Sequence, residues 1–371
     1  MVSLSNHTRT RERIAMLPNL LYVGTYTRSG RSEGIYVYRR DPQSGALTRR
    51  HTVAADDPSF LAFDPGQRFL FAVGESNAYQ GRDSGSVASF AIDQDTGNLA
   101  PISRQSTHGG DPCHLATDQA GRFLVVANHE HGSVAVLPIA ADGQLAPATD
   151  VRQHEGSGPG PSQKGPHAHC VTLDPTRQRI LVNDKGIDKV MIYRLDTAAG
   201  RLVPAEPPFA QLHSGAAPRH LAFHPSGRYA YVNGEADMTI TAFAYDARLG
   251  AFTELHYLST LPEGAAGERF STAQIVVAPS GRFVYVSNRG HDSIAIFAID
   301  QATGRLTALG HESTRGRTPR NFNIDPTGSF LYAANQDSDT IVLFRIDQQT
   351  GRLTATGDVT EVGAPVCILF S

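Results

Sequence analysis

The chain has 371 residues, of which 40% are hydrophobic and 19% are charged, with a formal net charge of −3 at pH 7. This composition is typical of a globular protein with a large core. The weak net charge gives no support to a nucleic acid or an anionic membrane as partner. No stretch of the sequence approaches the roughly 20 apolar residues of a membrane-spanning helix.

Residues 1–18 are polar and lack the apolar run of a signal peptide. We expect them to form a loose leader, followed by one domain over residues 19–371. The three cysteines, Cys113, Cys170 and Cys367, show no metal-ribbon spacing. They suit a reducing compartment better than a disulfide framework, and we therefore expect the protein in the cytoplasm.

From Asn19 onward, one phrase recurs along the chain: a small turn, then an apolar and aromatic run. The shortened first copy is NLLYVGTYT, and six complete copies such as DPGQRFLFAVGE and HPSGRYAYVNGEA follow it at intervals of 47 to 56 residues. Their first residues are Asp64, Asp118, Asp174, His224, Ala278 and Asp325. A period of about 50 residues indicates a repeat architecture.

A second phrase lies between the copies of the first and also occurs seven times, from DPQSGALT to DQQTGRLT. Its central Gly suits a hairpin turn that needs a positive φ. Each repeat then contains four short segments of strand length and composition. The sequence predicts an all-β fold, a seven-bladed β-propeller with four antiparallel strands per blade. We expect the C-terminal APVCILF to pair with LLYVGTY and close the ring.

The repeats differ at positions that carry reactive side chains. Five residues before each turn, at the start of the innermost strand, one column reads Ser59, Cys113, His169, Arg219, Ala273, Arg320 and Val366. At the end of the second strand, Asn288 belongs to one column, and the next reads Tyr26, Glu75, His129, Lys185, Glu235, Arg289 and Gln336. Because the two strands are antiparallel, we expect all these columns at one mouth of the channel.

This arrangement would gather several cations around one cavity. Arginine presents a planar fork of donors that suits phosphate or carboxylate groups, so we expect a small anionic substrate. A histidine there can act as acid or base near neutral pH. The Gly/Pro-rich residues 155–166 and the stretch LPEGAAGERFSTA are candidate rim or lid loops.

Some of the residues near this mouth also suit other roles. His167, His169 and His129 could bind zinc, but the surrounding cations oppose a divalent ion, and we expect neither a metal nor another cofactor. His129 and Glu75 suit polar channel groups better than catalysts. His114 and His220 lie one position off the column and are expected to point between blades. Cys113 is expected to be an inert thiol.

The stretches LYVGTYT, GPGPSQKGPHAHC, PRHLAFHPSGRYAYVNGE, VYVSNRGHDSIAIF and PRNFNIDPTGSFLYAANQ resemble the seven-bladed propeller lactonase family. This family includes the propeller type of 6-phosphogluconolactonase and the fungal carboxymuconate-lactonising enzymes. The resemblance runs from about Asn19 to Ser371. It implies a cofactor-free catalytic site formed by His169, Glu235, Arg219 and Arg289. The motifs around His167 and Arg320 are more similar to the lactonase branch than to the cyclising branch.

We therefore expect hydrolysis of a sugar lactone, foremost 6-phosphogluconolactone to 6-phosphogluconate. His169 with Glu235 would activate water, and the arginines would hold anionic groups. The expected substrate-binding residues are Arg320, His167, Lys185 and Asn288. Two alternatives stay open: a cycloisomerase that closes a carboxymuconate-type polycarboxylate into a lactone, and a non-catalytic propeller that binds a ligand or a protein.

Overall fold

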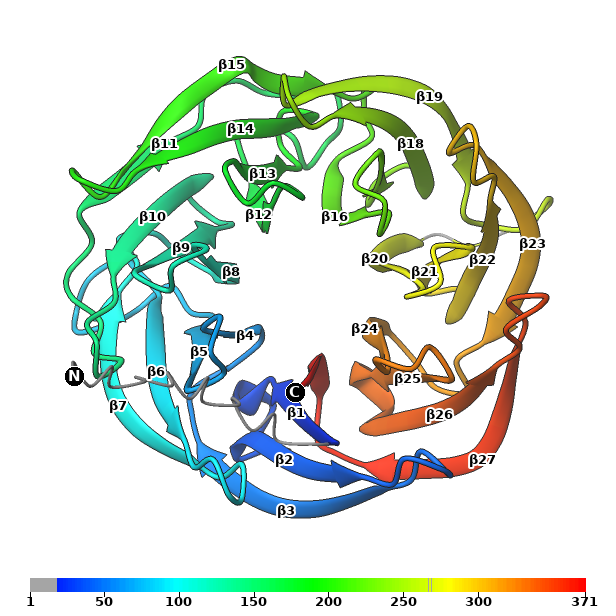
Figure 1. The fold of residues 1–371 in the computed structure, drawn as a ribbon, viewed down its shortest axis with the longest axis horizontal. Helices are drawn as coiled ribbons and strands as arrows, with labels where there is room; N and C mark the ends of the chain where they lie inside the picture. The colour runs from blue at the N-terminus through cyan, green and yellow to red at the C-terminus, as the bar shows by residue number, and fades with distance from the viewer. Residues whose placement is uncertain (1–18, 266, 268) are drawn as a thin grey trace, which may run out of the picture.

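A computed structural model describes residues 19–371 except residues 266 and 268. The expected leader, residues 1–18, lies outside the described residues. Seven antiparallel sheets of four strands each are arranged around a common axis (Figure 1). The expected seven-bladed β-propeller is therefore confirmed. Within the described residues, the helices are two three-residue 3-10 turns, η1 (Thr27–Ser29) and η2 (Gln336–Ser338), and no helix there is long and apolar enough to cross a membrane.

The first four blades, each written from its innermost to its outermost strand, are as follows. Blade 1 contains β28 (Pro365–Phe370), β1 (Leu20–Thr25), β2 (Gly34–Arg40) and β3 (Leu47–Ala54). Blade 2 contains β4 (Leu61–Phe63), β5 (Phe69–Gly74), β6 (Ser86–Ile92) and β7 (Leu99–Ser106). Blade 3 contains β8 (Pro112–Thr117), β9 (Phe123–Asn128), β10 (Ser133–Pro138) and β11 (Asp150–Gln153). Blade 4 contains β12 (Ala168–Leu173), β13 (Ile180–Asp184), β14 (Lys189–Asp196) and β15 (Arg201–Gln211).

The remaining three blades continue around the ring. Blade 5 contains β16 (Pro218–Phe223), β17 (Tyr229–Gly234), β18 (Thr239–Asp246) and β19 (Ala251–Ser259). Blade 6 contains β20 (Ser271–Val277), β21 (Phe283–Arg289), β22 (Ser293–Ile299) and β23 (Leu306–Ser313). Blade 7 contains β24 (Pro319–Ile324), β25 (Phe330–Asn335), β26 (Thr340–Ile346) and β27 (Leu353–Glu361).

The ring is closed as expected, by the C-terminal strand β28 lying beside β1. Their antiparallel register pairs Leu21 with Phe370 and Val23 with Ile368. The end of the chain therefore lies near the axis, next to the first strand (Figure 1). This pairing gives β1 a hydrogen-bonded neighbour on its inner side and removes an open sheet edge.

Neighbouring blades pack through apolar faces and through a repeated hydrogen bond. A buried tyrosine in the second strand donates its hydroxyl to the carbonyl of the Gly in the hairpin turn of the next blade. The pairs are Tyr22 with Gly97 (2.8 Å), Tyr231 with Gly304 (3.0 Å), Tyr285 with Gly351 (2.8 Å) and Tyr332 with Gly45 (2.7 Å). These turn glycines have φ between 72° and 81°, a conformation that side chains with a Cβ rarely adopt.

The innermost strands carry a β-bulge at the position of the first column. In blades 3, 4, 5 and 7 the register against the second strand skips one residue between Pro112 and His114, Ala168 and Cys170, Pro218 and His220, and Pro319 and Asn321. The skipped residues are Cys113, His169, Arg219 and Arg320. A bulged residue is unpaired and can point in a direction that regular pleating does not allow. The bulges therefore decide where these side chains point.

Candidate functional site

Glu235 is the centre of a partly buried charge cluster at the mouth where the innermost strands begin. It follows β17, and its carboxylate contacts cations from three blades. The Nζ of Lys185 lies 2.5 Å from Oε1, while Nε of Arg219 and Nη2 of Arg289 lie 2.8 and 3.1 Å from Oε2. Burial alone would raise the pKa of Glu235, but these three cations hold it well below its usual value. Glu235 is therefore ionised at neutral pH.

His169 lies beside this cluster on β12. Its side chain is 4% exposed, and its Nδ1 makes no hydrogen bond with any described residue. Burial, followed by the charges of Arg219 and Lys185, holds the pKa of His169 well below its usual value. The imidazole is therefore neutral at pH 7, and one nitrogen is available to accept a proton.

Two further histidines line the blade 3 side of the same mouth. The ring of His129 lies 5.7 Å from that of His169 and stacks on His167 at 4.8 Å between centroids. Nε2 of His129 is 3.4 Å from Nζ of Lys185, and Nδ1 of His167 is 3.0 Å from the carbonyl of His129. Burial and the adjacent Lys185 lower the pKa of His129 to about 3, so this ring also stays neutral.

Arg320 faces the cavity from β24 with unused donors. Its guanidinium carbon lies 5.3 Å from the centroid of the Tyr26 ring, and it makes no hydrogen bond or ion pair with a described side chain. Burial disfavours its charge, but Tyr26, Glu75 and Glu235 together raise its pKa. Arg320 is thus a charged, unpaired group that can receive an anion.

Glu75, Tyr26 and Ser59 form a second polar group, whose members belong to the two sequence columns but are not among the expected substrate-binding residues. The Tyr26 hydroxyl lies 2.8 and 3.0 Å from the Glu75 carboxylate oxygens, and Ser59 donates to the same carboxylate at 2.5 Å. Together with His169, Arg219 and Arg320, they line one small cavity. Their positions in the two columns were the signal that could have identified them.

One expectation is corrected by the structure, the substrate-binding role of Asn288. Asn288 is fully buried, donates to the carbonyl of Thr260 at 2.7 Å and accepts from its hydroxyl at 2.8 Å, so it joins blades 5 and 6 and does not face the cavity. His114 and His220 each contact the next blade, as expected: Nδ1 of His114 accepts the N–H of Val171 at 3.3 Å, and Nδ1 of His220 lies 2.5 Å from Oε1 of Gln274. Their rings also meet each other at 5.3 Å, although blades 3 and 5 are not adjacent.

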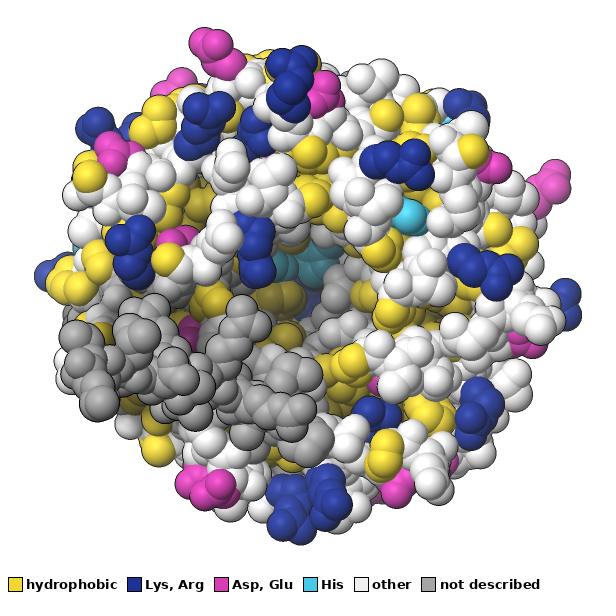
Figure 2. Space-filling model, viewed as in Figure 1, with side chains coloured by type: hydrophobic (Ala, Val, Ile, Leu, Met, Phe, Trp, Pro, Cys, Tyr) yellow, Lys and Arg dark blue, Asp and Glu magenta, His cyan; other side chains and the backbone are white. Residues whose placement is uncertain are grey.

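These two rings and Phe60 form a floor across the channel. Phe60 stacks on His114 at 3.7 Å between centroids and lies 6.2 Å from His220. Beyond His114 lies a cavity of about 590 Å³ that reaches toward the turns between the first and second strands. Figure 2 shows that the face in view is hollowed at its centre, with histidine on the wall of the hollow. The floor makes the charge cluster a one-sided pocket.

Residues 155–166 reach this mouth, as expected for a rim loop. Gln163 is buried, and its Nε2 donates to the carbonyl of Lys185 at 2.7 Å and to Oδ1 of Asp188 at 2.6 Å. The loop is thereby bonded to the backbone of Lys185, the residue whose side chain enters the charge cluster. The second candidate loop, LPEGAAGERFSTA, includes residues outside the described part of the chain.

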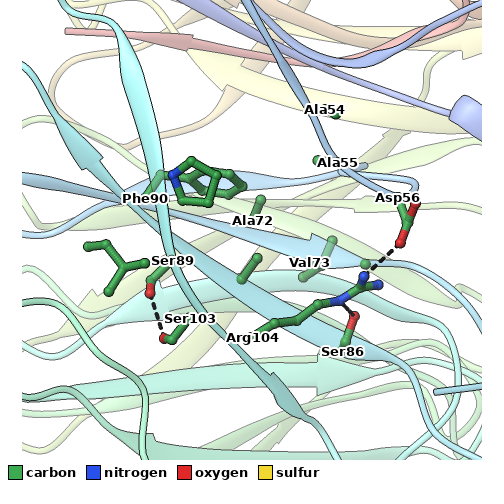
Figure 3. A pocket seen from close by; sticks show the side chains of 14 residues that line it. Ala54, Ala55, Asp56, Ala72, Val73, Ser86, Ser89, Phe90, Ser103 and Arg104 are labelled. Atoms are coloured by element: carbon green, nitrogen blue, oxygen red, sulfur yellow. Dashed lines mark hydrogen bonds and ion pairs between the residues drawn. The ribbon is translucent and has the colours of Figure 1, made fainter. Parts of the chain in front are cut away.

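A separate cavity of about 320 Å³ lies between the end of β3 and strands β5 to β7 (Figure 3). Its walls are mostly small or apolar, including Ala72, Phe90 and Ala55. Its charged residues already satisfy each other, because Arg104 contacts Asp56 at 2.6 Å and Ser86 at 2.8 Å. It contains no histidine, and the proposed chemistry does not use it.

The described residues contain no group of three or more His, Cys, Asp or Glu side chains arranged to hold a metal ion. The catalytic and substrate-binding residues expected from the sequence, other than Asn288, do lie together at one mouth. These are His169, Glu235, Arg219, Arg289, Lys185, His167 and Arg320.

Comparisons with known proteins agree with this architecture. Residues 20–370 match the family model described as "Lactonase, 7-bladed beta-propeller". A 6-phosphogluconolactonase of Bacillus subtilis is 37% identical over 305 residues, which cover 82% of this chain and 84% of the relative. One of Formosa agariphila is 32% identical over 311 residues, which cover 82% of this chain and 86% of that relative.

Solved structures show the same likeness. A structure from Pseudomonas aeruginosa, described as a periplasmic gluconolactonase, has a TM-score of 0.89 and 37% identity over 95% of this chain and 98% of its own. A putative 6-phosphogluconolactonase from Bacteroides fragilis has a TM-score of 0.88 and 35% identity over 95% of this chain and 97% of its own.

Proposed function

This chain belongs to the seven-bladed β-propeller lactonase family, and from that membership we propose that it hydrolyses a sugar lactone, 6-phosphogluconolactone to 6-phosphogluconate, without a cofactor. The observation that supports this most directly is the contact of Glu235 with three cations beside a neutral His169. Such a pocket can bind an anionic lactone and remove a proton from water.

His169 is the proposed base, because Glu235 is poorly suited to that role. Both carboxylate oxygens of Glu235 are held by cations that keep its pKa low, so it has little affinity for a proton. His169 is neutral, and its buried Nδ1 has no hydrogen-bond partner among the described residues. The same burial and cations make it a weak base in the empty pocket. An anionic substrate would offset the charges of Arg219 and Lys185 and raise the pKa of His169 when it is needed.

The reaction then proceeds by acyl transfer to water. His169 takes a proton as the water oxygen attacks the lactone carbonyl carbon, and the carbonyl oxygen becomes an oxyanion. Remaining guanidinium donors of Arg219 and Arg289 would stabilise this charge. The ring C–O bond breaks as the intermediate collapses, and His169 returns the proton to the ring oxygen. The product is a hydroxy acid, whose carboxyl proton leaves to solvent.

The charge of the pocket supports a phosphorylated substrate. Lys185, Arg219 and Arg289 share the single carboxylate of Glu235, and Arg320 is unpaired. A cationic excess in a partly buried pocket favours a dianion such as a phosphomonoester. We assign Arg320, with Lys185 and His167 at the rim, to the phosphate and hydroxyl groups of the substrate.

The test is a direct assay of 6-phosphogluconolactone hydrolysis by purified wild type, His169→Ala and Arg289→Ala. We expect both variants to lose about 100-fold or more in kcat/KM with unchanged circular dichroism. Near-wild-type rates in both variants would contradict the proposed roles of His169 as base and of Arg289 in stabilising the oxyanion. Phosphate binding without turnover in the wild type would favour the non-catalytic propeller instead.

The same cations would also suit a polycarboxylate, so a cycloisomerase is the second candidate. It would use His169 as proton donor while a carboxylate of a carboxymuconate-type substrate adds to a double bond. Assaying both substrates with one enzyme preparation separates the two activities. If the enzyme converts only the polycarboxylate, its function is cycloisomerisation and not lactone hydrolysis.

We further infer that residues 19–371 act as one domain in the cytoplasm. The three cysteines support this location, since Cys113, Cys170 and Cys367 are all buried free thiols. Fractionation of cells that express the full chain tests the location, and an extracytoplasmic pool would contradict it.

A further inference from the structure

The strand that carries His169 begins differently from the corresponding strand in most other blades. We call the residue two positions before each column residue the rim position. In blades 1, 2, 3, 5 and 7 the rim residue has a left-handed backbone. Those residues are Ala364 (φ 43°), Asp57 (41°), Asp111 (47°), Ala217 (52°) and Thr318 (57°). In blade 4 the rim residue is His167, and its φ is not positive.

The backbone N–H of the rim residue also has a different partner in blade 4. In the five left-handed cases it donates to a group of the preceding blade. The bonds are Ala364 to Asp339 (2.7 Å), Asp57 to Thr27 (2.9 Å), Asp111 to Ser76 (3.0 Å), Ala217 to Asp188 (2.8 Å) and Thr318 to Asp292 (2.8 Å). The N–H of His167 donates instead to Oδ1 of Asp184, in its own blade, at 2.7 Å.

Asp184 holds the two segments that supply the pocket with His167 and Lys185. Its Oδ1 also accepts the N–H of Gly186 at 2.9 Å. Asp184 and Gly186 flank Lys185 in the chain, so this bond fixes the backbone on both sides of Lys185. The N–H of Lys185 in turn donates to the carbonyl of His167 at 3.0 Å. Both backbone polar groups of His167 are therefore fixed by consecutive residues, Asp184 and Lys185.

The second oxygen of Asp184 is fixed by His154. Its Oδ2 lies 2.6 Å from Nδ1 of His154, and the two side chains are 0% and 1% exposed. At three other junctions the corresponding pair is an uncharged Asn and Thr, in which the amide donates to the Thr carbonyl. These pairs are Asn128 with Thr107, Asn288 with Thr260 and Asn335 with Thr314. A neutral pair is thus sufficient to join two blades.

A fully buried carboxylate is costly unless several donors compensate it. Unlike an amide, it accepts on both oxygens. This allows Asp184 to receive two backbone N–H groups and the imidazole of His154 together. Among the seven residues at this column position, Asp184 alone carries a charge, and it stands in the blade that carries the proposed base, which indicates a role beyond blade packing.

We propose that Asp184, oriented by His154, is a positioning residue for the active site. It replaces the left-handed rim turn with a backbone that leads directly into β12, so that the rim residue of this blade, His167, reaches the pocket in addition to His169. It also fixes the backbone of Lys185, whose Nζ contacts Glu235 at 2.5 Å. The catalytic part of this proposal rests on the proposed function, in which His169 is the base.

The experiment compares Asp184→Ala, Asp184→Asn and the matched control Asp339→Ala in the full chain. Asp339 makes the same kind of bond, to the N–H of Ala364, but its strand carries Val366 at the column position. We expect Asp184→Ala to lower kcat for 6-phosphogluconolactone by about 10- to 100-fold with a smaller change in KM, because small misplacements of a base are costly. Asp184→Asn keeps an acceptor oxygen for both N–H groups and should recover most of the kcat.

The control variant should keep the wild-type kcat, and it should lose less thermal stability, because the Asp339 side chain is 36% exposed whereas that of Asp184 is 0% exposed. Equal losses of kcat in Asp184→Ala and Asp339→Ala, or a wild-type kcat in folded Asp184→Ala, would overturn the proposal. Amide hydrogen exchange of the peptide that contains His167 provides a readout independent of activity, and its protection should fall in Asp184→Ala only. If the wild type lacks lactonase activity, the proposed function fails, while unchanged exchange in Asp184→Ala would disprove the positioning.

Discussion

The Nε atom of Arg219 lies 2.8 Å from Oε2 of Glu235, so a bulged residue of β16 and the residue that follows β17 form an ion pair in which Arg219 is buried and Glu235 is partly exposed. Arg219 is 3% exposed, and its Nη1 also donates to the carbonyl of Ala273 at 2.7 Å in the next blade. The guanidinium therefore joins two blades while part of it still faces the cavity. Glu235 thus holds the cations of the pocket in place and balances part of their charge, and the first prediction tests that role.

Glu235→Gln should lower kcat and strengthen inhibition by inorganic phosphate. The substitution removes the one negative charge that Lys185, Arg219 and Arg289 share. The freed cations would bind a competing anion more tightly and would lower the pKa of His169 further. We expect a fall in kcat of about 100-fold and a fall in the phosphate inhibition constant of about 10-fold. An unchanged inhibition constant would show that Glu235 does not balance these charges.

Arg320→Gln should impair phosphorylated lactones more than unphosphorylated ones. Arg320 is the cation of the cavity without a side-chain partner, so its donors are available to the phosphate. Loss of a hydrogen bond to a charged group costs about 1.5–3 kcal/mol, which corresponds to about a 10- to 150-fold rise in KM. The measurement is KM for 6-phosphogluconolactone and for gluconolactone. The exposed Arg345 provides the matched control, Arg345→Gln, and equal effects on both lactones would contradict the assignment.

The acid limb of kcat/KM should lie below pH 6.5, the usual pKa of histidine. Burial and the adjacent cations lower the pKa of His169, so the free enzyme keeps its neutral base as the pH falls through 6.5. Activity is lost only when the ring is protonated at lower pH. A pH profile of kcat/KM between pH 4 and 8 tests this. A midpoint above 6.5 would mean that another group limits the rate.

Folding stability should decrease as the pH falls below 6.5. Burial lowers the pKa of His114 and of His129 to about 3, and that of His169 and His220 well below the usual value. Between pH 6.5 and these lower values, the unfolded chain binds more protons than the folded protein. Each such group then removes about 1.4 kcal/mol of stability per pH unit.

Urea unfolding at a series of pH values measures this slope. His114→Gln is the control variant, because it removes one of these groups from the channel floor. Its slope should be smaller than that of the wild type by about one proton. Parallel slopes for the two proteins would show that His114 is not the source of this dependence.

Tyr332→Phe should destabilise the closed ring without affecting turnover. The buried hydroxyl of Tyr332 donates to the carbonyl of Gly45 at 2.7 Å and joins blade 7 to blade 1. Its removal leaves that carbonyl without the bond, at a cost of about 1 kcal/mol. Denaturant unfolding measures the loss. Phe344→Leu, in the same blade, is a control for packing alone, and no loss in Tyr332→Phe would show that the hydroxyl bond is dispensable.

The repeated phrases in the sequence allowed the blade number, the closing strand and the approximate position of the pocket to be predicted. Both columns could be aligned because the turn residues, such as Asp174 and Asp325, recur at similar spacing. The antiparallel connection between first and second strands then placed His169 and Glu235 at one mouth. His114 and His220 contact the next blade as the sequence indicated, but their contact with each other across the channel could not be predicted from alternation along one strand.

Contacts between blades were also beyond the reach of the sequence. Asn288 stands in a column that ends at the mouth, but its amide is bonded to Thr260, which is 28 residues away in the chain and in another blade. The bond between Asp184 and His154 spans 30 residues in the same way. No local pattern reveals which partner a polar side chain finds across a blade junction.

The sequence by itself determined the architecture, because repeats of about 50 residues that each contain four strand-like segments are typical of the blades of a β-propeller. It also determined which residue types stand at the mouth of the channel. Only the tertiary structure decided which of them face the cavity and which charges they meet. The reason is physical. The bulges set the direction of the side chains, and the packing of three adjacent blades brings Nζ of Lys185 and Nη2 of Arg289 to 2.5 and 3.1 Å from the carboxylate of Glu235.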